Sequence, residues 1–250
     1  MNRVSLGLGL LSIGRQWGVN AVQPPDDDAS GRLIEAAIDA GIRFFDTAPA
    51  YARSEEIFGR SLRADPARSA ELFIATKAGE HWDDGTGSTY VDHGFAALSR
   101  SIDTSLQRLG RIDLLQIHKA NAAVVTSSEV LRALDHAQAA GITAFGASVS
   151  DLDGARAVCA SGRYSHIQFP FNREQGALLP VFDMAAEHGI TVIVNRPFAM
   201  GALSAAPVEQ FRYILEHISG AGIILTGTSS QAHLADNLAA FTAASGQGQG

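Results

Sequence analysis

Short apolar runs alternate with longer amphipathic stretches along almost the whole chain. Between the runs, apolar residues recur at three- and four-residue spacing, as at Leu98, Ile102 and Leu106, which predicts helices. The runs predict strands at Val4–Leu10, Arg43–Asp46, Leu72–Lys77, Leu114–His118, Thr143–Ala147, His166–Phe169, Thr191–Asn195 and Gly222–Thr226. Eight strand–helix units in succession predict a parallel sheet that closes on itself, a (β/α)8 TIM barrel.

Residues at the ends of the predicted helices support this division. Ser30 and Asp92 stand where helix N-caps are expected. Gly41, Gly141 and Gly189 each follow a predicted helix and precede a strand, where a left-handed C-terminal position favours glycine. We therefore expect compact helix-to-strand turns at these three glycines.

The competing architecture is an open, doubly wound sheet that binds a dinucleotide at its first turn. The stretch Gly7-Leu-Gly9-Leu-Leu-Ser12 has serine where that motif needs its third glycine, and no helix is predicted directly after it. We therefore expect one barrel domain over residues 1–245. The Gly- and Gln-rich residues 246–250 are predicted to form a disordered tail.

Composition excludes several classes of partner. The 250 residues are 46% hydrophobic and 18% charged, with a net charge of −7 and no run of Lys or Arg, which excludes nucleic acid. No apolar stretch is long enough to span a bilayer, and glycines and serines interrupt the apolar N-terminal residues, which suits a strand better than a leader. The single cysteine, Cys159, allows no internal disulfide, so we expect a cytoplasmic protein.

Four chemically different side chains gather at the predicted strand ends. Asp46 ends the second strand and Tyr51 follows five residues later, while Lys77 and His118 end the third and fourth strands. Each alone suits a solvated or structural position, but function in a barrel belongs at the carboxyl ends of its strands. A buried Lys77 would need a partner, and Asp46 is available.

These four side chains can protonate an alkoxide as it forms. A free tyrosine has a pKa of about 10, too high for an efficient acid at neutral pH. An ammonium beside Tyr51 should lower that pKa, and a carboxylate should hold the ammonium in place. A histidine can orient a carbonyl by hydrogen bonding. The pattern therefore predicts Tyr51 as general acid, assisted by Lys77, Asp46 and His118.

Three segments resemble the aldo-keto reductase family. Residues 41–51, GIRFFDTAPAY, resemble its active-site signature, residues 109–118 resemble the segment that carries its histidine, and residues 225–237 resemble its adenosine-phosphate segment. The likeness runs from about residue 5 to about residue 243. It implies NAD(P)H-dependent reduction of an aldehyde or ketone to the alcohol, or the reverse oxidation, with Asp46, Tyr51, Lys77 and His118 as the catalytic tetrad.

The resemblance also implies a cofactor site, with NADPH favoured and NADH as the alternative. Val149 stands where the family has an asparagine beside Ser148, and Arg196 lies near the position of a stacking tyrosine. We expect Arg196 to lie on the nicotinamide ring or to contact the pyrophosphate. The implied cofactor-binding residues are Ser148, Gln168, Asn195, Arg196, Pro197, Phe198, Gly201, Gly227, Thr228, Ser229, His233, Asp236 and Asn237.

The loop 227–230 leads into the last helix, whose N-terminal amides could bind a phosphate or could simply be capped by a serine. Asp236 and Asn237 match the family's acid–asparagine pair at the adenine edge. Gly227 and His233 replace the lysine and arginine that often hold the 2′-phosphate, which weakens the preference for NADPH.

Loops should shape the substrate pocket, with Trp17, Trp82 and Phe198 as candidate walls. The segment Ala78–Thr89, rich in Gly, Asp and Thr, is expected to be mobile. Few residues follow the last predicted helix, so the mouth is expected to be open. The histidines lack paired ligand spacing, so no metal is expected. The expected partner is a small carbonyl compound, and the oligomeric state stays open.

Two other functions remain open. A strand-end lysine can form a Schiff base with a carbonyl, so Lys77 could serve a lyase, although a charged Lys77 would argue against this. The chain could also be a non-catalytic accessory protein that senses nicotinamide nucleotides.

Overall fold

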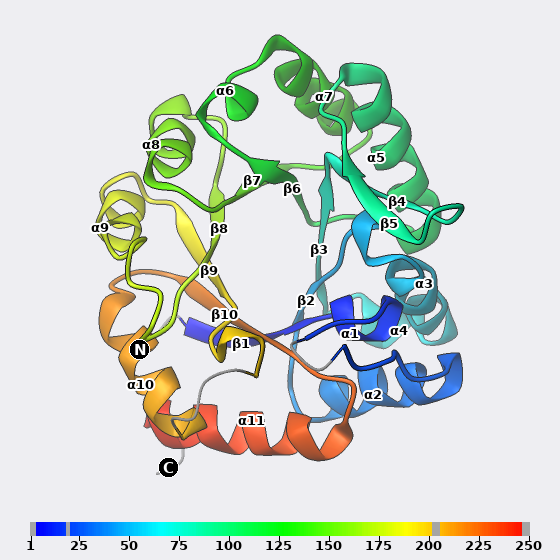
Figure 1. The fold of residues 1–250 in the computed structure, drawn as a ribbon. Coiled ribbons are helices and arrows are strands. Elements are labelled where there is room, and N and C mark those ends of the chain that lie inside the picture. Colours follow the sequence, from blue (N-terminus) through cyan, green and yellow to red (C-terminus); the bar gives the residue numbers. More distant parts are fainter. Residues whose placement is uncertain (1–3, 19–20, 202–205, 247–250) are drawn as a thin grey trace.

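The structure is a computed structural model that describes residues 4–18, 21–201 and 206–246. Across these residues eight parallel strands close into a barrel in the order β1-β10-β9-β8-β7-β6-β3-β2, and helices surround it (Figure 1). The barrel strands are β1 Val4–Gly9, β2 Phe44–Asp46, β3 Phe73–Ala78, β6 Leu114–Ala120, β7 Ala144–Val149, β8 His166–Pro170, β9 Thr191–Asn195 and β10 Gly222–Gly227. The predicted TIM barrel is confirmed, and each predicted strand is present to within two residues at either end.

The helices lie on the outside of the strands. The α-helices are α1 Leu11–Gly14, α2 Asp27–Asp39, α3 Ser54–Ala64, α4 Pro66–Ser69, α5 Phe95–Leu109, α6 Ala122–Val125, α7 Ser128–Ala139, α8 Leu152–Ser161, α9 Pro180–Glu187, α10 Pro207–His217 and α11 Gln231–Ser245. Two 3-10 turns, η1 Pro49–Tyr51 and η2 Ala199–Gly201, follow β2 and β9. No helix within the described residues is long and apolar enough to cross a membrane.

Strand alternation divides the core into two parts and sets which side chains reach the mouth. One buried cluster comprises Phe44, Ala75, Leu114, Ile193, Ile223 and Leu225, contributed by five of the strands. Their chain neighbours, such as Phe45 and Ile74, belong to the larger cluster that includes helix residues. Side chains on a strand alternate between its two faces. Four polar residues each follow a member of the Phe44-containing cluster by two positions, so they also point into the barrel: Asp46, Lys77, Gln116 and Asn195.

The helix ends agree only in part with those predicted from the sequence. Gly41, Gly141 and Gly189 have φ of +88°, +95° and +66°, as predicted. The predicted N-caps are wrong. Asp26 caps α2, and Ser30 lies buried inside that helix, while Gly94 precedes α5 and Asp92 accepts a hydrogen bond from the Gly94 amide.

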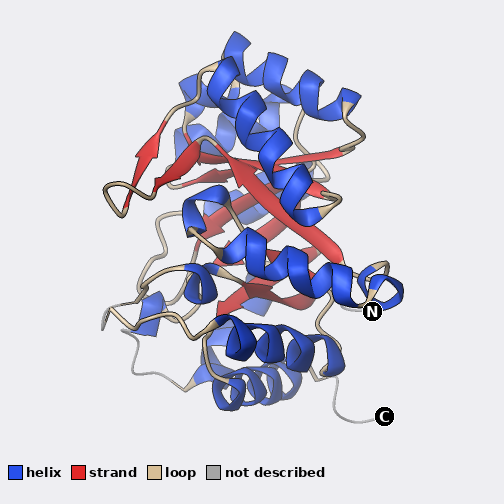
Figure 2. Cartoon of the chain, turned by 90° about the vertical axis from the view of Figure 1, so that its right-hand side faces the viewer, coloured by secondary structure: helices blue, strands red, loops and turns tan. Residues whose placement is uncertain are grey.

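A β-hairpin that the sequence did not predict occupies most of the segment 78–89. Strands β4 Glu80–Asp83 and β5 Ser88–Val91 pair antiparallel, outside the barrel beside α3 and α5 (Figure 1). In the side view the hairpin projects from one end of the barrel (Figure 2). Gly79 lets the chain leave β3 for β4, because its φ of +111° favours glycine.

Most of the predicted disordered tail, residues 246–250, lies outside the described residues. Helix α11 ends at Ser245, and Gly246 follows it with φ of +69°, a left-handed C-terminal position. Residues 247–250 of the predicted tail are not among those described.

Candidate active site

Asp46 lies at the centre of a polar cluster at the carboxyl ends of the barrel strands, the mouth of the barrel. Lys77 Nζ pairs with Asp46 Oδ2 and also donates to the Thr47 carbonyl oxygen over 3.1 Å. The amides of Gln116 and Gln168 donate to Asp46 Oδ1 over 2.9 and 3.2 Å. Because Asp46 is only 3% exposed, these donors replace the water that the carboxylate loses on folding.

Lys77 keeps its positive charge in this setting. Its side chain is fully buried, and burial alone would lower its pKa, but Asp46 and then Tyr51 raise the pKa above its usual value. The ammonium is therefore fixed in place as a permanent cation.

Tyr51 lies beside that cation. It ends η1, and its ring centroid is 4.9 Å from Lys77 Nζ. The pKa of Tyr51 was expected below 10, but it is raised, because burial outweighs the opposing effect of the Lys77 ammonium and Asp46 adds to the rise. The phenol therefore stays protonated in the free protein.

A close approach of α1 holds the Tyr51 loop. Gly14 has no Cβ, and the Tyr51 carbonyl oxygen occupies the space that such an atom would fill, 1.8 Å from its ideal position. Ser54 adds a hydrogen bond to the Leu10 carbonyl oxygen over 3.0 Å. The residue after the tyrosine, Ala52, has φ of +49°, a conformation that side chains other than glycine rarely adopt.

His118 completes the predicted tetrad. Its ring is edge-on to that of Tyr51, with centroids 6.0 Å apart. The pKa of His118 is well below its usual value, because the ring is buried and the charges of Lys77 and Lys119 oppose protonation. The structure thus brings all four predicted catalytic residues together, with a neutral imidazole facing a protonated phenol.

A cavity of about 390 Å³ beside the ends of β1, β9 and β10 collects most of the predicted cofactor residues. Its lining includes the predicted residues Trp17, Arg196, Pro197, Phe198, Gly201, Gly227, Thr228, Ser229, His233 and Asn237. Trp17 and Phe198 were candidate substrate walls, and they lie in this cavity as well.

The lining of the cavity suits an anionic group such as a phosphate. Arg196 supplies a positive charge, and no acidic side chain is found among the lining residues that the structure describes. Thr226 carries a buried hydroxyl without a hydrogen-bond partner among the described residues. The cavity also borders the start of α11, where Ser230 caps the helix by accepting from the His233 amide, and helix N-termini attract phosphate.

The other predicted cofactor residues lie outside this cavity. Ser148 and Gln168 are aligned neighbours on β7 and β8, but the Gln168 amide nitrogen already donates to Asp46. Asn195 ends β9 with its side-chain oxygen buried and unpartnered in the described part of the chain. Asp236 is exposed on α11.

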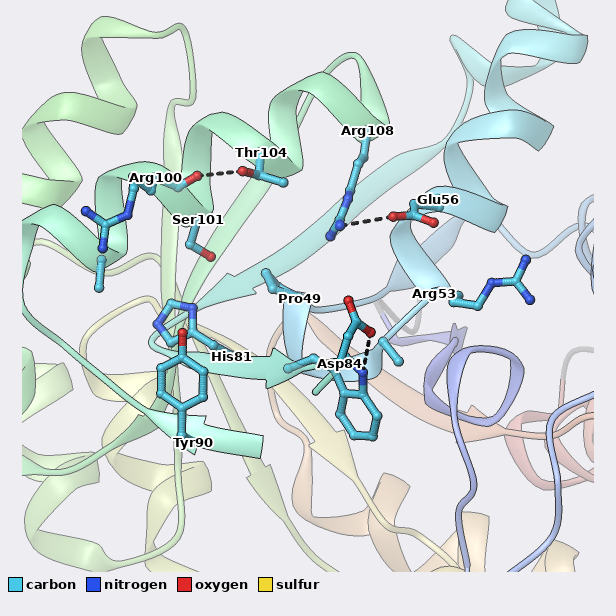
Figure 3. Close-up of a pocket in the computed structure, with 13 residues that line it drawn as sticks. Pro49, Arg53, Glu56, His81, Asp84, Tyr90, Arg100, Ser101, Thr104 and Arg108 are labelled. Carbon is cyan, nitrogen blue, oxygen red and sulfur yellow. Dashed lines mark hydrogen bonds and ion pairs between the residues drawn. The ribbon is translucent and has the colours of Figure 1, made fainter. Parts of the chain in front are cut away.

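Trp82 lies in a different cleft from Trp17. This cleft, of about 480 Å³, lies between the β4–β5 hairpin, α3 and α5, and it includes His81, Tyr90 and Arg100 in its lining (Figure 3). Pro49 and Ala52, from the loop that carries Tyr51, also line it. Trp82 Nε1 donates to Asp84 over 2.9 Å. The three predicted substrate walls therefore do not share one cavity.

Sequence reasoning missed three polar residues of the site. Gln116 lies two residues before His118 on the same face of β6, so strand alternation could have revealed it. Glu80 begins β4 of the hairpin, and its Oε2 lies 3.1 Å from His118 Nδ1. Ser12 donates to the Thr228 carbonyl oxygen over 2.7 Å and so ties α1 to the loop before α11, a contact between residues 216 positions apart.

The chain is similar in sequence to known proteins. The aldo/keto reductase family model matches residues 5–212. An aldo-keto reductase of Bacillus subtilis is 30% identical over 219 residues, which cover 83% of this chain and 62% of the relative. A D-threo-aldose 1-dehydrogenase of a Pseudomonas species is 29% identical over 259 residues, covering 84% and 70%.

A similar fold is found among solved structures. One assigned to an aldo-keto reductase of Pseudomonas aeruginosa has a TM-score of 0.82 and 31% sequence identity, covering 96% of this chain and 89% of that one. The chain spans 62% to 64% of the length of the first curated relatives that it matches.

Proposed function

The chain belongs to the aldo/keto reductase family, and we propose that it reduces an aldehyde or ketone to the alcohol, or catalyses the reverse oxidation, with NAD(P)H. The observation that carries the proposal is the buried Lys77–Asp46 pair beside Tyr51. A proton donor next to a fixed cation at the mouth of a barrel suits a reaction in which a carbonyl oxygen gains negative charge.

The residues act as follows in this proposal. A bound nicotinamide supplies the hydride. Tyr51 donates its proton to the carbonyl oxygen, and Lys77 stabilises the phenolate that remains. Asp46, itself held by Gln116 and Gln168, keeps Lys77 in position and charged.

The cofactor would lie across the ends of β7 to β10. Ser148 and Gln168 would hold the nicotinamide amide, Asn195 and the cavity residues would follow the diphosphate, and Asp236 and Asn237 would meet the adenine. Thr228 and Ser229 would donate hydrogen bonds to a 2′-phosphate, which favours NADPH over NADH.

The proposal is tested by titrating NADPH and NADH against the protein fluorescence and then supplying a panel of aldehydes and ketones with the cofactor that binds. We expect NADPH or NADH to bind with a dissociation constant on the order of 1 µM to 1 mM, the range of typical KM values, and we expect turnover of at least one carbonyl class. Tight cofactor binding without any turnover would favour the accessory-protein alternative.

The lyase alternative has less support. A Schiff base forms from a neutral amine, whereas the raised pKa of Lys77 keeps its side chain as an ammonium ion. If borohydride trapped a substrate carbonyl on Lys77, the result would support the lyase instead.

The substrate is proposed to be a small polar carbonyl compound. The relative named D-threo-aldose 1-dehydrogenase acts, by its name, on a polyhydroxy aldehyde. The mouth of this chain likewise contains the hydrogen-bonding side chains of Tyr51 and His118.

A further inference from the structure

The cleft between the β4–β5 hairpin, α3 and α5 is separate from the catalytic tetrad. No member of the tetrad is among the lining residues that the structure describes. Its volume of about 480 Å³ lies within the range of small-molecule sites, about 300–1,000 Å³. The cleft therefore has the size of a binding site, and the proposed carbonyl reduction makes no use of it.

A buried hydroxyl in the wall of this cleft has no partner. Ser101, on α5, is 8% exposed, and its Oγ has no hydrogen-bond partner among the described residues. Ser101 lines the cleft, and its hydroxyl points away from α5 toward Pro49 and the hairpin (Figure 3). Burial of a hydroxyl without a hydrogen bond is unfavourable. A serine hydroxyl turns between three staggered positions, so a ligand oxygen in the cleft is within its reach.

One arginine of the cleft has no acidic partner. Arg108 Nη2 lies 3.0 Å from Glu56 Oε1, and Arg53 pairs with Asp27. Arg100 directly precedes the unpartnered serine on α5, and it forms no ion pair with any residue that the structure describes. A single free guanidinium, in a lining that also contains two carboxylates, suits a singly charged anion, because a dianion would be repelled more strongly.

The rest of the lining offers apolar and aromatic surface. Pro49, Ala52 and Ala97 line the cleft, and the indole of Trp82 adds an aromatic face. Trp82 Nε1 donates to Asp84 over 2.9 Å, which holds the indole in place and occupies that carboxylate. Aromatic rings pack favourably against one another, so a ligand of this cleft should carry an aromatic ring beside its anionic group.

We propose that this cleft is an effector site for a small aromatic carboxylate. The carboxylate lies against Arg100 and accepts a hydrogen bond from Ser101, while the ring packs against Trp82. The ligand binds together with the carbonyl substrate, because the two occupy different parts of the molecule.

Two elements connect the cleft to the tetrad. Pro49 lines the cleft and begins η1, which ends at Tyr51. Strand β4 supplies Trp82 and begins at Glu80, whose Oε2 lies 3.1 Å from His118 Nδ1. A ligand held between η1 and β4 stabilises the arrangement in which the tetrad is assembled, so its binding raises turnover.

Binding is tested without any turnover. The chain has two tryptophans, so the ¹H–¹⁵N spectrum of the labelled full chain has two indole signals, and Trp82→Phe assigns both. We expect benzoate to shift the Trp82 signal with a dissociation constant on the order of 1 mM, as for a ligand of this size. The signal of Trp17, in the cavity beside β1, β9 and β10, should stay in place. A shift of Trp17 alone, or no saturable shift of Trp82, would overturn the proposal.

The two polar contacts are tested at constant ionic strength. Benzamide has the shape of benzoate without its charge and should bind about fivefold more weakly or worse. Arg100→Gln and Ser101→Ala should each weaken benzoate binding by about fivefold or more. The matched control is Arg156→Gln, which removes an exposed arginine of α8 and should leave the affinity unchanged. Wild-type affinity in both cleft variants would contradict the proposed contacts.

The effector role is tested in the carbonyl assay. Saturating benzoate should raise kcat, and the carbonyl substrate should leave the benzoate-shifted Trp82 signal in place. Displacement of benzoate by the carbonyl would assign it to the mouth instead, and an unchanged or lower kcat would overturn the effector role. The indole titrations need no turnover, so they decide whether the cleft binds benzoate even if the proposed carbonyl reduction is wrong.

Discussion

At the scale of single residues, the mouth is organised around one buried charge pair. Asp46 receives donors from Lys77, Gln116 and Gln168, and Lys77 in turn lies against Tyr51. The same groups that stabilise the carboxylate therefore set the electrostatics of the proposed acid. The stability of the fold and the proposed proton transfer therefore depend on the same contacts of Asp46 and Lys77.

Lys77→Met should strongly destabilise the fold, because it removes the cation and leaves the Asp46 carboxylate buried without its counter-charge. We expect a loss of about 3–5 kcal/mol in the free energy of unfolding, measured by urea denaturation. The double variant Asp46→Asn, Lys77→Met should recover much of this loss, since no unpaired charge remains. A loss below about 1 kcal/mol in the single variant would show that the pair behaves like an exposed one.

The sequence predicted which residue types meet at the mouth, but not the contacts that hold them. Asp46, Lys77 and His118 were found because strand ends converge in a barrel. Glu80 escaped notice because its contact depends on a hairpin that the Gly- and Asp-rich sequence did not suggest. The direction of the Tyr51 pKa shift also depends on its burial, which the sequence does not specify.

At the scale of elements, helix α3 is anchored to its neighbours through one buried carboxyl group. Glu55 accepts from Thr76 on β3 over 2.7 Å and from Ser105 on α5 over 2.7 Å, and Arg108 lies 3.3 Å away. Burial nevertheless raises the pKa of Glu55 above its usual value. The anchor therefore carries an electrostatic cost when it is ionised.

This cost predicts a pH dependence for Glu55→Gln. Because the folded protein holds the Glu55 proton more tightly than the unfolded chain does, the wild type loses stability as the pH rises through about 4.5 and above. The stability of Glu55→Gln relative to the wild type should therefore increase with pH across this range. Denaturation at several pH values measures the trend, with Glu56→Gln as the exposed control, and a relative stability that falls with pH would contradict it.

Replacing two helix glycines by alanine should change the stability of the protein in opposite directions. At Gly59 of α3 a Cβ would lie 1.9 Å from the Arg108 carbonyl oxygen, so α3 and α5 would have to separate. Gly59→Ala should cost about 1–3 kcal/mol or more. At Gly31 of α2 nothing lies within 4 Å, and Gly31→Ala should gain about 0.5–1 kcal/mol from helix propensity. Thermal denaturation of both variants measures the contrast, and equal effects would contradict the proposed close packing.

Elements with strong periodicity were predictable and irregular ones were not. All eight barrel strands appear where their apolar runs predicted them, because burial on both faces leaves a clear pattern. The N-cap of α2 was misplaced by four residues, since Asp26 precedes a polar first turn that shows no apolar periodicity. The hairpin strands β4 and β5 are four residues each, and β5 is largely exposed, so no apolar run predicted them.

At the scale of the whole molecule, the two ends of the chain close the barrel. Strand β1 pairs with β10 over six positions, from Val4 with Gly222 to Gly9 with Gly227, and it also pairs with β2. This closure brings Trp17, after the first strand, next to Gly227 and Ser229, at the end of the last. The proposed cofactor cavity therefore exists only in the closed barrel, whereas the tetrad is built from β2, η1, β3 and β6.

Paired tyrosine variants test whether Tyr51 is the proton donor of a nicotinamide-dependent carbonyl reductase. Tyr90→Phe, at a half-exposed position in the hairpin, is the matched control. We expect Tyr51→Phe to lower kcat for carbonyl reduction by about 10²–10⁴-fold with the NADPH dissociation constant unchanged, while Tyr90→Phe keeps near wild-type values of both. Full turnover in Tyr51→Phe would show that Tyr51 is not the proton donor.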